Sequence, residues 1–280
     1  MSPTPNTTTT PPPDSGRPNY SQGVPAVAQA SKILFYLAGA GRSQQTLTEI
    51  CREVGIHKSK GYAILNTLME SALVVRSEGA KTYALGPGLL VLSRSVLDHS
   101  DLRGSVAPFL ANLSRGTACT TLLGLVSAGR VLVVAKHEAE TGMAVAIRVG
   151  HRYPLTWGAH GKAMVAFLEK EELRQVLAGE PLYFWGDPAR GVEDPVALAA
   201  ELEACREAGY ATDLGGVQPG VSAASSPLFG SAARPIGAVM AVGTFAPECA
   251  VSVGQAVAGT ARELSALLGP TLESLYGLQR

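Results

Sequence analysis

Basic and hydroxyl side chains gather at Lys58-Ser59-Lys60, where a helix is expected to begin. An ammonium group contacts DNA phosphates or guanine edges, and a hydroxyl group bonds to either. Arg76 and Lys81 follow on an expected hairpin, placed for phosphate contact beside that helix. Lys and Ser are also common on any solvated helix face, so the prediction of DNA binding depends on the elements that carry these residues.

A second group, His160-Gly161-Lys162, lies where a loop gives way to another expected helix. The free backbone N–H groups of a helix N-terminus hold an anion such as a carboxylate. Gly158 and Gly161 permit a ligand to approach the backbone closely. The alternative is that these two glycines only shape a tight loop.

The sequence carries no recognisable catalytic motif. The segment Gly220-Val-Ser222-Ala-Ala lacks the second glycine of a nucleophile elbow. His137, His151 and His160 do not have the spacing of metal ligands. A Gly-rich phosphate-binding loop ending in Lys-Ser or Lys-Thr is also missing. We therefore expect no enzymatic activity, no cofactor and no bound metal.

The cysteines are scattered without paired spacing, which favours free thiols in a reducing cytoplasm over disulfides. They are Cys51, Cys119, Cys205 and Cys249. No apolar run approaches the roughly 18 residues that a membrane span needs, and no basic segment followed by an apolar one marks a secretory signal. We expect a cytoplasmic protein without a membrane partner; redox sensing through Cys119 or Cys205 is an alternative.

Two short amphipathic helices carry the first basic group. Thr46 is placed as an N-cap with Glu49 three residues later, which is the pattern of a capping box. Gly55 ends that helix, and a second helix begins near Lys58. Two helices separated by a Gly-containing turn predict a helix-turn-helix. The core face of the second helix is expected to consist of Gly61, Ile64, Leu65 and Leu68.

The opposite face of the second helix and the hairpin after it would read DNA. Apolar-rich runs on both sides of a Gly turn, over residues 73–85, predict the wing of a winged helix. Such a helix lies in the major groove with its N-terminal residues nearest the bases. The residues expected to contact DNA are Lys58, Ser59, Lys60, Tyr62, Ala63, Asn66, Arg76 and Lys81.

The rest of the chain predicts a second domain of α+β class. Helical stretches alternate with hairpin-like strands, including a strand expected at residues 143–149, which argues against a doubly wound sheet. We predict a disordered Thr- and Pro-rich tail over residues 1–22, a winged helix-turn-helix over 23–86, a connector helix over 87–100 and an effector-binding domain over 101–280.

The charge distribution agrees with this division. Residues 24–86 carry seven Lys and Arg against four Glu, whereas residues 101–280 carry 14 basic against 17 acidic side chains. A basic N-terminal part followed by an acidic C-terminal part fits a DNA-binding module attached to another domain.

Several segments together resemble the isocitrate lyase regulator (IclR) family. In the first half these are Leu47-Thr-Glu-Ile-Cys-Arg-Glu-Val-Gly-Ile, His57-Lys-Ser-Lys, Leu65-Asn-Thr-Leu-Met-Glu-Ser-Ala-Leu-Val and Tyr83-Ala-Leu-Gly-Pro. In the second half they are Val149-Gly-His-Arg-Tyr-Pro-Leu, Ala159-His-Gly-Lys-Ala-Met-Val-Ala-Phe-Leu, Gly209-Tyr-Ala-Thr-Asp, Gly220-Val-Ser-Ala-Ala-Ser-Ser-Pro and a closing Ala-Val-Gly-Thr. The resemblance covers roughly residues 24–270.

The resemblance implies a transcriptional regulator whose GAF-like second domain binds a small organic acid. We expect a homodimer joined through the connector helix and the winged-helix domains, with two recognition helices on a near-palindromic operator in double-stranded DNA, and effector domains that pair dimers into a dimer of dimers. Carried over by position, together with the loop and helix start described above, the expected effector-binding residues are Trp157, Ala159, His160, Gly161, Asp213, Ala223, Ala241 and Gly243.

Departures from the family's pattern sharpen these expectations. Ala63 stands where the family often has arginine, so an operator sequence is not transferable. Gly61 stands where a β-branched residue is common; a mid-helix glycine costs about 0.5–1 kcal/mol relative to alanine, which suggests close helix packing. The small residues at Ala223, Ala241 and Gly243 favour a bulkier, aromatic acid.

Two other readings of the whole chain are kept open. One is a winged-helix regulator that responds to redox state or to a protein partner. The other is an enzyme with a vestigial DNA-binding domain.

Overall fold

The computed structural model describes two compact units, Met1–His99 and Ser100–Arg280. The residues described are 23–39, 44–77, 79–99, 102–140, 146–179, 181–186, 195–231 and 234–276. The tail expected over residues 1–22 lies outside them.

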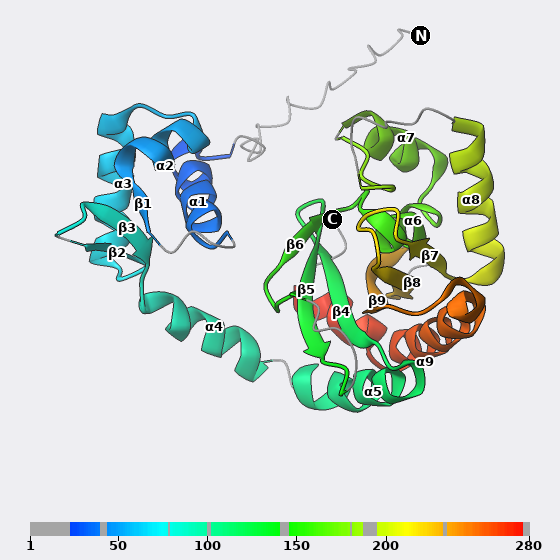
Figure 1. Ribbon diagram of the computed structural model, residues 1–280. Helices are drawn as coiled ribbons and strands as arrows, with labels where there is room; N and C mark the ends of the chain where they lie inside the picture. Colours follow the sequence, from blue (N-terminus) through cyan, green and yellow to red (C-terminus); the bar gives the residue numbers. More distant parts are fainter. Residues whose placement is uncertain are drawn as a thin grey trace, which may run out of the picture. The chain divides into compact units, whose positions relative to one another are not determined.

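The first unit is a helical cluster with a small antiparallel sheet (Figure 1). Its sheet has the strand order β1-β3-β2. Its elements are α1 (Pro25–Leu37), β1 (Gln45–Thr46), α2 (Leu47–Val54), α3 (Lys58–Glu70), β2 (Val74–Ser77), β3 (Thr82–Leu85) and α4 (Gly88–His99).

Local signals determine where α2 begins and ends. The Thr46 hydroxyl accepts a hydrogen bond from the Glu49 N–H at 3.3 Å, and the Glu49 carboxylate accepts one from the Thr46 N–H at 2.8 Å. This is the expected capping box. Gly55 ends the helix in the left-handed region with φ 72°. The helices pack on a core that includes Ile33, Ile50, Leu65, Val74 and Tyr83.

Gly61 is where α2 and α3 approach each other. A Cβ atom at this position would overlap the Sγ atom of Cys51 on α2. The close helix packing suggested by this glycine is therefore present.

The start of α4 is fastened to the turn between α3 and β2. Gly86 N–H donates to the Leu73 carbonyl at 2.8 Å, and Gly88 N–H donates to the Ala72 carbonyl at 2.9 Å. A Cβ atom on Gly88 would lie 2.7 Å from the Ser71 carbonyl oxygen and 2.9 Å from that of Ala72. Glycine is therefore required for this close backbone contact.

The second unit contains a six-stranded antiparallel sheet with the order β6-β5-β4-β9-β8-β7. Its helices are α5 (Leu102–Thr117), α6 (Gly158–Val165), α7 (Lys170–Gly179), α8 (Pro195–Ala208) and α9 (Ala250–Tyr276). Its strands are β4 (Thr120–Ser127), β5 (Arg130–His137), β6 (Arg152–Pro154), β7 (Ala211–Leu214), β8 (Ser222–Phe229) and β9 (Pro235–Gly243), and a 3₁₀ turn spans Pro247–Cys249.

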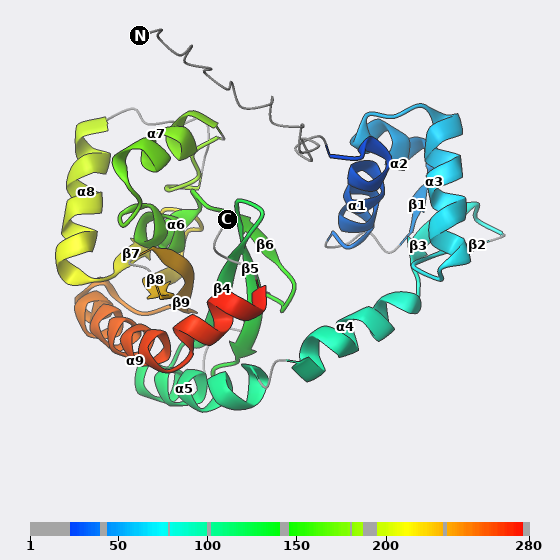
Figure 2. The ribbon, with the colours of Figure 1, turned by 180° about the vertical axis from the view of Figure 1, so that it is seen from behind.

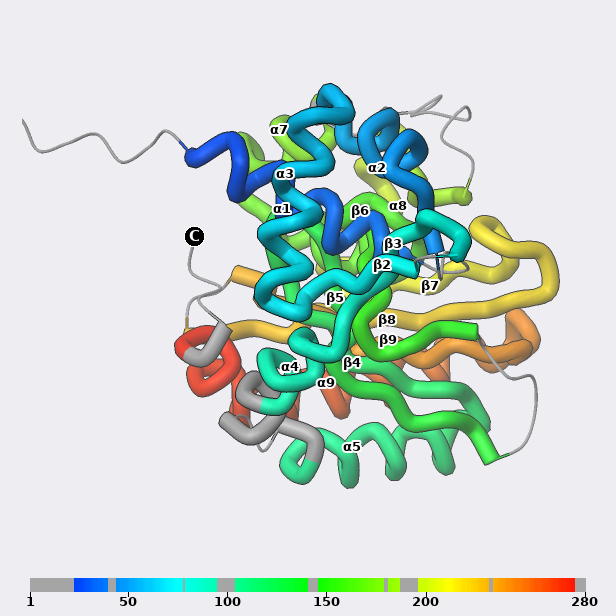
Figure 3. The backbone as a smooth tube through the Cα atoms, turned by 90° about the vertical axis from the view of Figure 1, so that its left-hand side faces the viewer, coloured from blue at the N-terminus to red at the C-terminus, as the bar shows by residue number. Residues whose placement is uncertain are grey.

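Helices cover both faces of this sheet (Figures 2 and 3). The main core lies between the sheet and α5 with α9, and it includes Leu110, Leu123, Val239, Ala241 and Val257. A second cluster joins α6, α7, α8 and β7 on the other side. The predicted α+β class with a winged helix-turn-helix in front of it is confirmed.

The strand expected at residues 143–149 is wrong where it can be checked. Residues 141–145 lie outside the described ones, and residues 146–150 form no strand. A turn at Gly150, with φ 93°, reverses the chain, and β6 pairs with β5 instead. The alternation of apolar residues in this segment indicated a strand but could not show which residues find a partner.

In the part of the chain that the structure describes, no helix combines the length and apolarity that crossing a membrane requires.

Candidate DNA-binding surface and ligand cavity

The exposed face of α3 carries the side chains expected to contact DNA. Its other face is buried at Gly61, Leu65 and Leu68. The residues predicted from α3 are all exposed except Asn66, which is half-buried: Lys58, Ser59, Lys60, Tyr62 and Ala63. The helix therefore presents a polar, basic first turn outward, as the recognition helix of a helix-turn-helix does.

The two wing residues are held differently. The Arg76 guanidinium on β2 lies 5.7 Å from the centre of the buried Tyr83 ring, which supports its side chain while leaving it exposed. Lys81 lies in the turn between β2 and β3, is exposed, and has a positive φ of 52°. Both residues are on the wing, as predicted.

Two further exposed residues belong to the same surface. His57 is the N-cap of α3 and makes no side-chain cap hydrogen bond. Thr67 lies one turn after Ala63 and donates its hydroxyl proton to the Ala63 carbonyl at 3.2 Å. The i, i+4 spacing from Ala63 was the signal that could have identified Thr67.

A cavity of about 260 Å³ lies in the second unit between the sheet and the start of α6. That volume equals the share of roughly eight or nine water molecules at about 30 Å³ each. Most of its wall is apolar, from Leu122, Ile147, Val217, Val221, Met240 and Val242. Among the described residues, no Lys or Arg side chain lines it.

The N-terminus of α6 opens on the cavity. Trp157 is the N-cap and makes no side-chain cap hydrogen bond. Gly158 N–H donates to the Tyr183 carbonyl at 3.1 Å, and Gly161 N–H to the Trp157 carbonyl at 2.8 Å. The N–H groups of Ala159 and His160, between them, have no partner among the described residues. Both residues are buried and line the cavity, so two unpaired donors face it.

His160 is neutral at physiological pH because its burial lowers its pKa from 6.5 to about 4. Its Nε2 atom lies 3.3 Å from the Pro154 carbonyl oxygen. That oxygen can only accept, so Nε2 carries the ring proton and Nδ1 is left as an acceptor.

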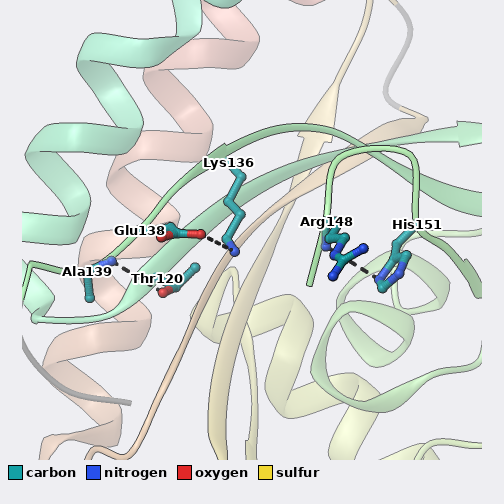
Figure 4. A network of polar contacts seen from close by, with 6 residues as sticks. All are labelled: Thr120, Lys136, Glu138, Ala139, Arg148 and His151. Carbon is teal, nitrogen blue, oxygen red and sulfur yellow. Dashed lines mark hydrogen bonds and ion pairs between the residues drawn. The ribbon is translucent and has the colours of Figure 1, made fainter. Parts of the chain in front are cut away.

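Aromatic side chains form part of the cavity wall. The ring of Tyr153 lies 5.7 Å from that of His160 and 6.0 Å from that of Trp157. The Tyr153 hydroxyl lies 3.3 Å from His151 Nδ1, and Arg148 N–H points at the same nitrogen at 3.5 Å. Figure 4 shows the contact of Arg148 with His151, and apart from it the ion pair between Lys136 on β5 and Glu138 just after that strand. Burial raises the pKa of Tyr153, so its phenol stays protonated.

Asp213 folds the loop that lies over the cavity. Its carboxylate accepts hydrogen bonds from the N–H groups of Gly216 at 2.9 Å and Val217 at 3.2 Å. Val217 and Gln218 of this loop line the cavity together with Asp213 itself. Asp213 therefore both shapes the loop and lines the cavity.

Five of the eight predicted effector-binding residues come together around the cavity. Trp157, Ala159, His160, Asp213 and Ala223 all line the cavity.

The other three, Gly161, Ala241 and Gly243, do not line the cavity. Ala241 packs in the core beneath the sheet, and a Cβ atom on Gly243 would meet Cys119 on that same side. Successive residues of a strand point to opposite faces, so the positions on β9 that face the cavity are Met240 and Val242. Gly161 instead packs against the backbone of Leu155 and Thr156.

Met240, Val242 and Ser225 were missed by the sequence reasoning. Val242 pairs with Ala223, and Met240 pairs with Ser225, across β8 and β9. Once Ala223 is chosen, this register identifies all three, but the register between two strands is not readable from either one alone.

Lys162, next to the predicted anion site, points away from it. Its ammonium group lies 2.6 Å from the Glu201 carboxylate of α8 and 5.2 Å from the centre of the Trp185 ring. Lys162 thus joins α6 to α8. Within the described ranges, no group of three or more His, Cys, Asp or Glu is arranged to hold a metal ion.

Comparisons with known proteins agree over nearly the whole length. Residues 26–78 match the family described as "IclR helix-turn-helix domain", and residues 94–266 match "Bacterial transcriptional regulator IclR C-terminal". The glycerol operon regulatory protein of Streptomyces griseus is 27% identical over 255 residues, covering 88% of this chain and 98% of that protein.

Solved structures share the fold. An IclR transcriptional regulator from Alicyclobacillus acidocaldarius superposes with a TM-score of 0.76 at 26% identity, covering 88% of this chain and 99% of that one. An IclR homologue from Microbacterium hydrocarbonoxydans, complexed with 4-hydroxybenzoate, superposes with a TM-score of 0.68 at 21% identity, covering 86% and 99% of the two chains.

Proposed function

The chain belongs to the IclR family of bacterial transcriptional regulators, and from that premise we propose that α3 and the wing bind its operator while the cavity beside α6 binds a small organic acid with one carboxylate. The observation that carries the DNA-binding part is the exposed Lys58-Ser59-Lys60 turn on a helix whose other face is buried. The observation that carries the acid-binding part is the pair of unpaired N–H groups at Ala159 and His160.

A salt series tests the DNA-binding proposal. The full-length protein is titrated against DNA from immediately upstream of its own gene, for wild type and for Lys58→Ala/Lys60→Ala. If both lysines contact phosphates, the variant binds more weakly and the slope of log K against log salt falls by nearly two, since each contact contributes about 0.9.

The matched control is Lys170→Ala/Arg262→Ala, which removes two exposed cations from the second unit. It is expected to leave the salt slope unchanged. An identical slope in wild type and in the Lys58→Ala/Lys60→Ala variant would contradict the proposal that α3 is the recognition helix.

The cavity supports a monoanionic effector with an apolar body. The N-terminus of α6 offers a single place for a carboxylate, and no cationic side chain among the described lining residues would hold a second one. The aromatic rings of Tyr153 and Trp157 suit an aromatic acid, and the Microbacterium relative binds 4-hydroxybenzoate.

Ligand binding is tested on the melting temperature and on DNA affinity. Benzoate and 4-hydroxybenzoate are expected to shift both, and a dicarboxylate such as phthalate to shift neither. A response to two-carbon acids alone would reject the aromatic proposal.

The proposed assembly is a homodimer, or a dimer of dimers, on a near-palindromic operator. It is supported by apolar side chains on α4 that are 55–72% exposed: Leu90, Val91 and Leu92. Binding of the acid would shift the equilibrium between connector geometries and hence the spacing of two recognition helices. Allosteric coupling of this kind is typically about 1–3 kcal/mol.

We expect no catalytic turnover of the acid, and we place the regulator in the cytoplasm because its proposed partner is the genome. A redox function is less well supported. Burial raises the pKa of Cys119 and raises that of Cys205 to about 11, which keeps both as unreactive thiols at neutral pH.

A further inference from the structure

The polar groups around the cavity are divided by type. The donors include the two unpaired backbone N–H groups of Ala159 and His160, and the side chains of Tyr153, Trp157 and Gln218 carry further donor groups. The buried side chains offer acceptors: the Asp213 carboxylate, the Nδ1 atom of His160, and Ser225, whose hydroxyl proton is given to the Val239 carbonyl at 3.1 Å. The Asp213 carboxylate already accepts from Gly216 and Val217, so a ligand that is only an anion would occupy the backbone donors and leave Nδ1 of His160 without a partner.

His160 is the most constrained of these acceptors. It is 7% exposed, and Nε2 is committed to the Pro154 carbonyl. No described residue bonds to Nδ1. Within the described ranges, Gln29 Oε1 is the fully buried side-chain nitrogen or oxygen that lacks a hydrogen-bond partner. Because Nδ1 of His160 also lacks a partner but is not such an atom, it must be partly accessible. His160 lines the cavity, so Nδ1 opens onto it.

The unpaired acceptor and one of the two unpaired donors belong to the same residue, in the first turn of α6. In a helix the Cα–Cβ bond tilts toward the N-terminus, and the N–H groups of the first turn also point there. The backbone N and the Nδ1 of one histidine are joined through four covalent bonds, so they lie on the order of 3–4 Å apart. A ligand that meets both therefore carries its acceptor and its donor on neighbouring atoms.

We infer that the effector is a 2-hydroxy carboxylate, held by its carboxylate on the N–H groups of Ala159 and His160 and by its hydroxyl on Nδ1 of His160, and that His160 is the residue that selects the hydroxyl. This inference rests on the proposed acid-binding function and narrows it. The carboxylate oxygen and the hydroxyl oxygen of such an acid have the close spacing required. A 2-keto acid places an acceptor opposite Nδ1, and a deoxy acid places nothing there.

Three probes of nearly equal size isolate the hydroxyl: mandelate, phenylacetate and phenylglyoxylate. Their binding to the full-length protein is measured by calorimetry. Mandelate is expected to bind about tenfold or more tightly than the other two, because an unsatisfied buried acceptor costs about 1–3 kcal/mol.

Two variants separate the ring nitrogens. In His160→Gln the side-chain amide reaches the position of Nε2 and still donates to Pro154, but the Nδ1 acceptor is lost. In His160→Asn the amide oxygen takes the position of Nδ1 and the bond to Pro154 is lost. The glutamine variant is expected to lose most of the preference for mandelate over phenylacetate, and the asparagine variant to keep part of it, with melting temperatures confirming that both fold.

A measurement on the ligand-free protein needs neither probe nor variant. The ¹⁵N chemical shifts of the His160 ring are expected to show the tautomer with hydrogen on Nε2. The opposite tautomer would overturn the inference whatever acids bind.

The failures are distinguishable. If phenylacetate binds as tightly as mandelate, or if His160→Gln keeps the preference, selection by His160 is wrong and the acid-binding function stands. If none of these acids and no benzoate binds while the operator is still bound, the acid-binding proposal fails and takes the inference with it.

Discussion

Cys51 lies against Gly61 where α2 meets α3, and this contact leaves no room for a methyl group at position 61. Gly61→Ala is expected to lower the free energy of unfolding by about 1–3 kcal/mol, because the new Cβ overlaps Sγ in a packed core. The same change would otherwise gain about 0.5–1 kcal/mol of helix propensity. Urea unfolding of the two proteins measures the difference.

Cys51→Ala/Gly61→Ala supplies the internal control. Removing Sγ makes room for the methyl group, so the double variant is expected to be more stable than the sum of the two single changes by about 1 kcal/mol or more. Gly259→Ala on α9, where a Cβ meets nothing within 4 Å, is expected to be neutral or stabilising. Additive single changes would show that the contact is not what requires glycine.

The buried neutral His160 makes stability depend on pH. Its folded-state pKa of about 4 lies below the unfolded value of 6.5, so the unfolded chain binds a proton over this range while the folded protein does not. The free energy of unfolding contributed by this residue therefore falls as the pH drops from about 6.5 toward 4, by up to about 3 kcal/mol. Unfolding of wild type and His160→Gln near neutral pH and at about pH 5 is expected to show a smaller loss in the variant; equal losses would contradict it.

At single positions, the sequence predicted which segments form the site better than it predicted which face of a strand each side chain occupies. His160 was nominated because it stands at an expected helix start, and Asp213 was carried over by position from the family resemblance; both line the cavity. Ala241 and Gly243 were placed one strand position away from Met240 and Val242, because alternation along β9 has no visible starting point when all nine of its residues are buried. A strand that is apolar on both faces does not show which face meets a ligand.

Among the elements, α4 depends most on an exact backbone contact. Gly88→Ala would place a Cβ 2.7 Å from the Ser71 carbonyl oxygen, and backbone cannot move aside as a side chain can. The variant is expected to destabilise the first unit by about 1–3 kcal/mol and to weaken operator binding. Thermal unfolding together with DNA titration measures both effects.

Gly79→Ala is the matched change in the same unit, since a Cβ there meets open space. It is expected to leave stability and DNA binding unchanged. If Gly88→Ala behaves like Gly79→Ala, the start of α4 is not fastened as the structure indicates.

Elements with local signals were predictable, and those defined by distant partners were not. The Thr46 capping box and Gly55 mark both ends of α2 within ten residues of sequence. By contrast, β6 is three residues long and exists because residues of β5 pair with it. Its location depends on a long-range hydrogen-bond register that no local pattern contains.

For the whole molecule, the exposed apolar residues of α4 predict association. Leu90→Glu/Val91→Glu is expected to shift the protein toward monomer in sedimentation experiments and to reduce operator binding, since a charge on an apolar interface is costly to bury. Leu267→Glu on α9, which alters a residue 60% exposed, is the comparison. A wild-type protein that is monomeric at micromolar concentration would remove the dimer proposal.

The two-unit organisation was predictable because charge and periodicity change along the chain. The cavity was not, since its wall joins β4, β8, β9 and the start of α6, which lie up to 120 residues apart from Leu122 to Val242. Only tertiary packing shows that these segments enclose one space.

The fastening of Gly86 and Gly88 to the turn at Ala72 bears on how such regulators can be recombined. The wing and the first turn of α4 form one structural unit, because the backbone contacts that join them lie within it. A hybrid biosensor that exchanges DNA-binding domains should therefore be joined after Gly88, so that each domain keeps its own contacts between the turn and the start of the connector helix. A fusion point before Gly86 would place these glycines against a turn from another protein, whose backbone need not fit them.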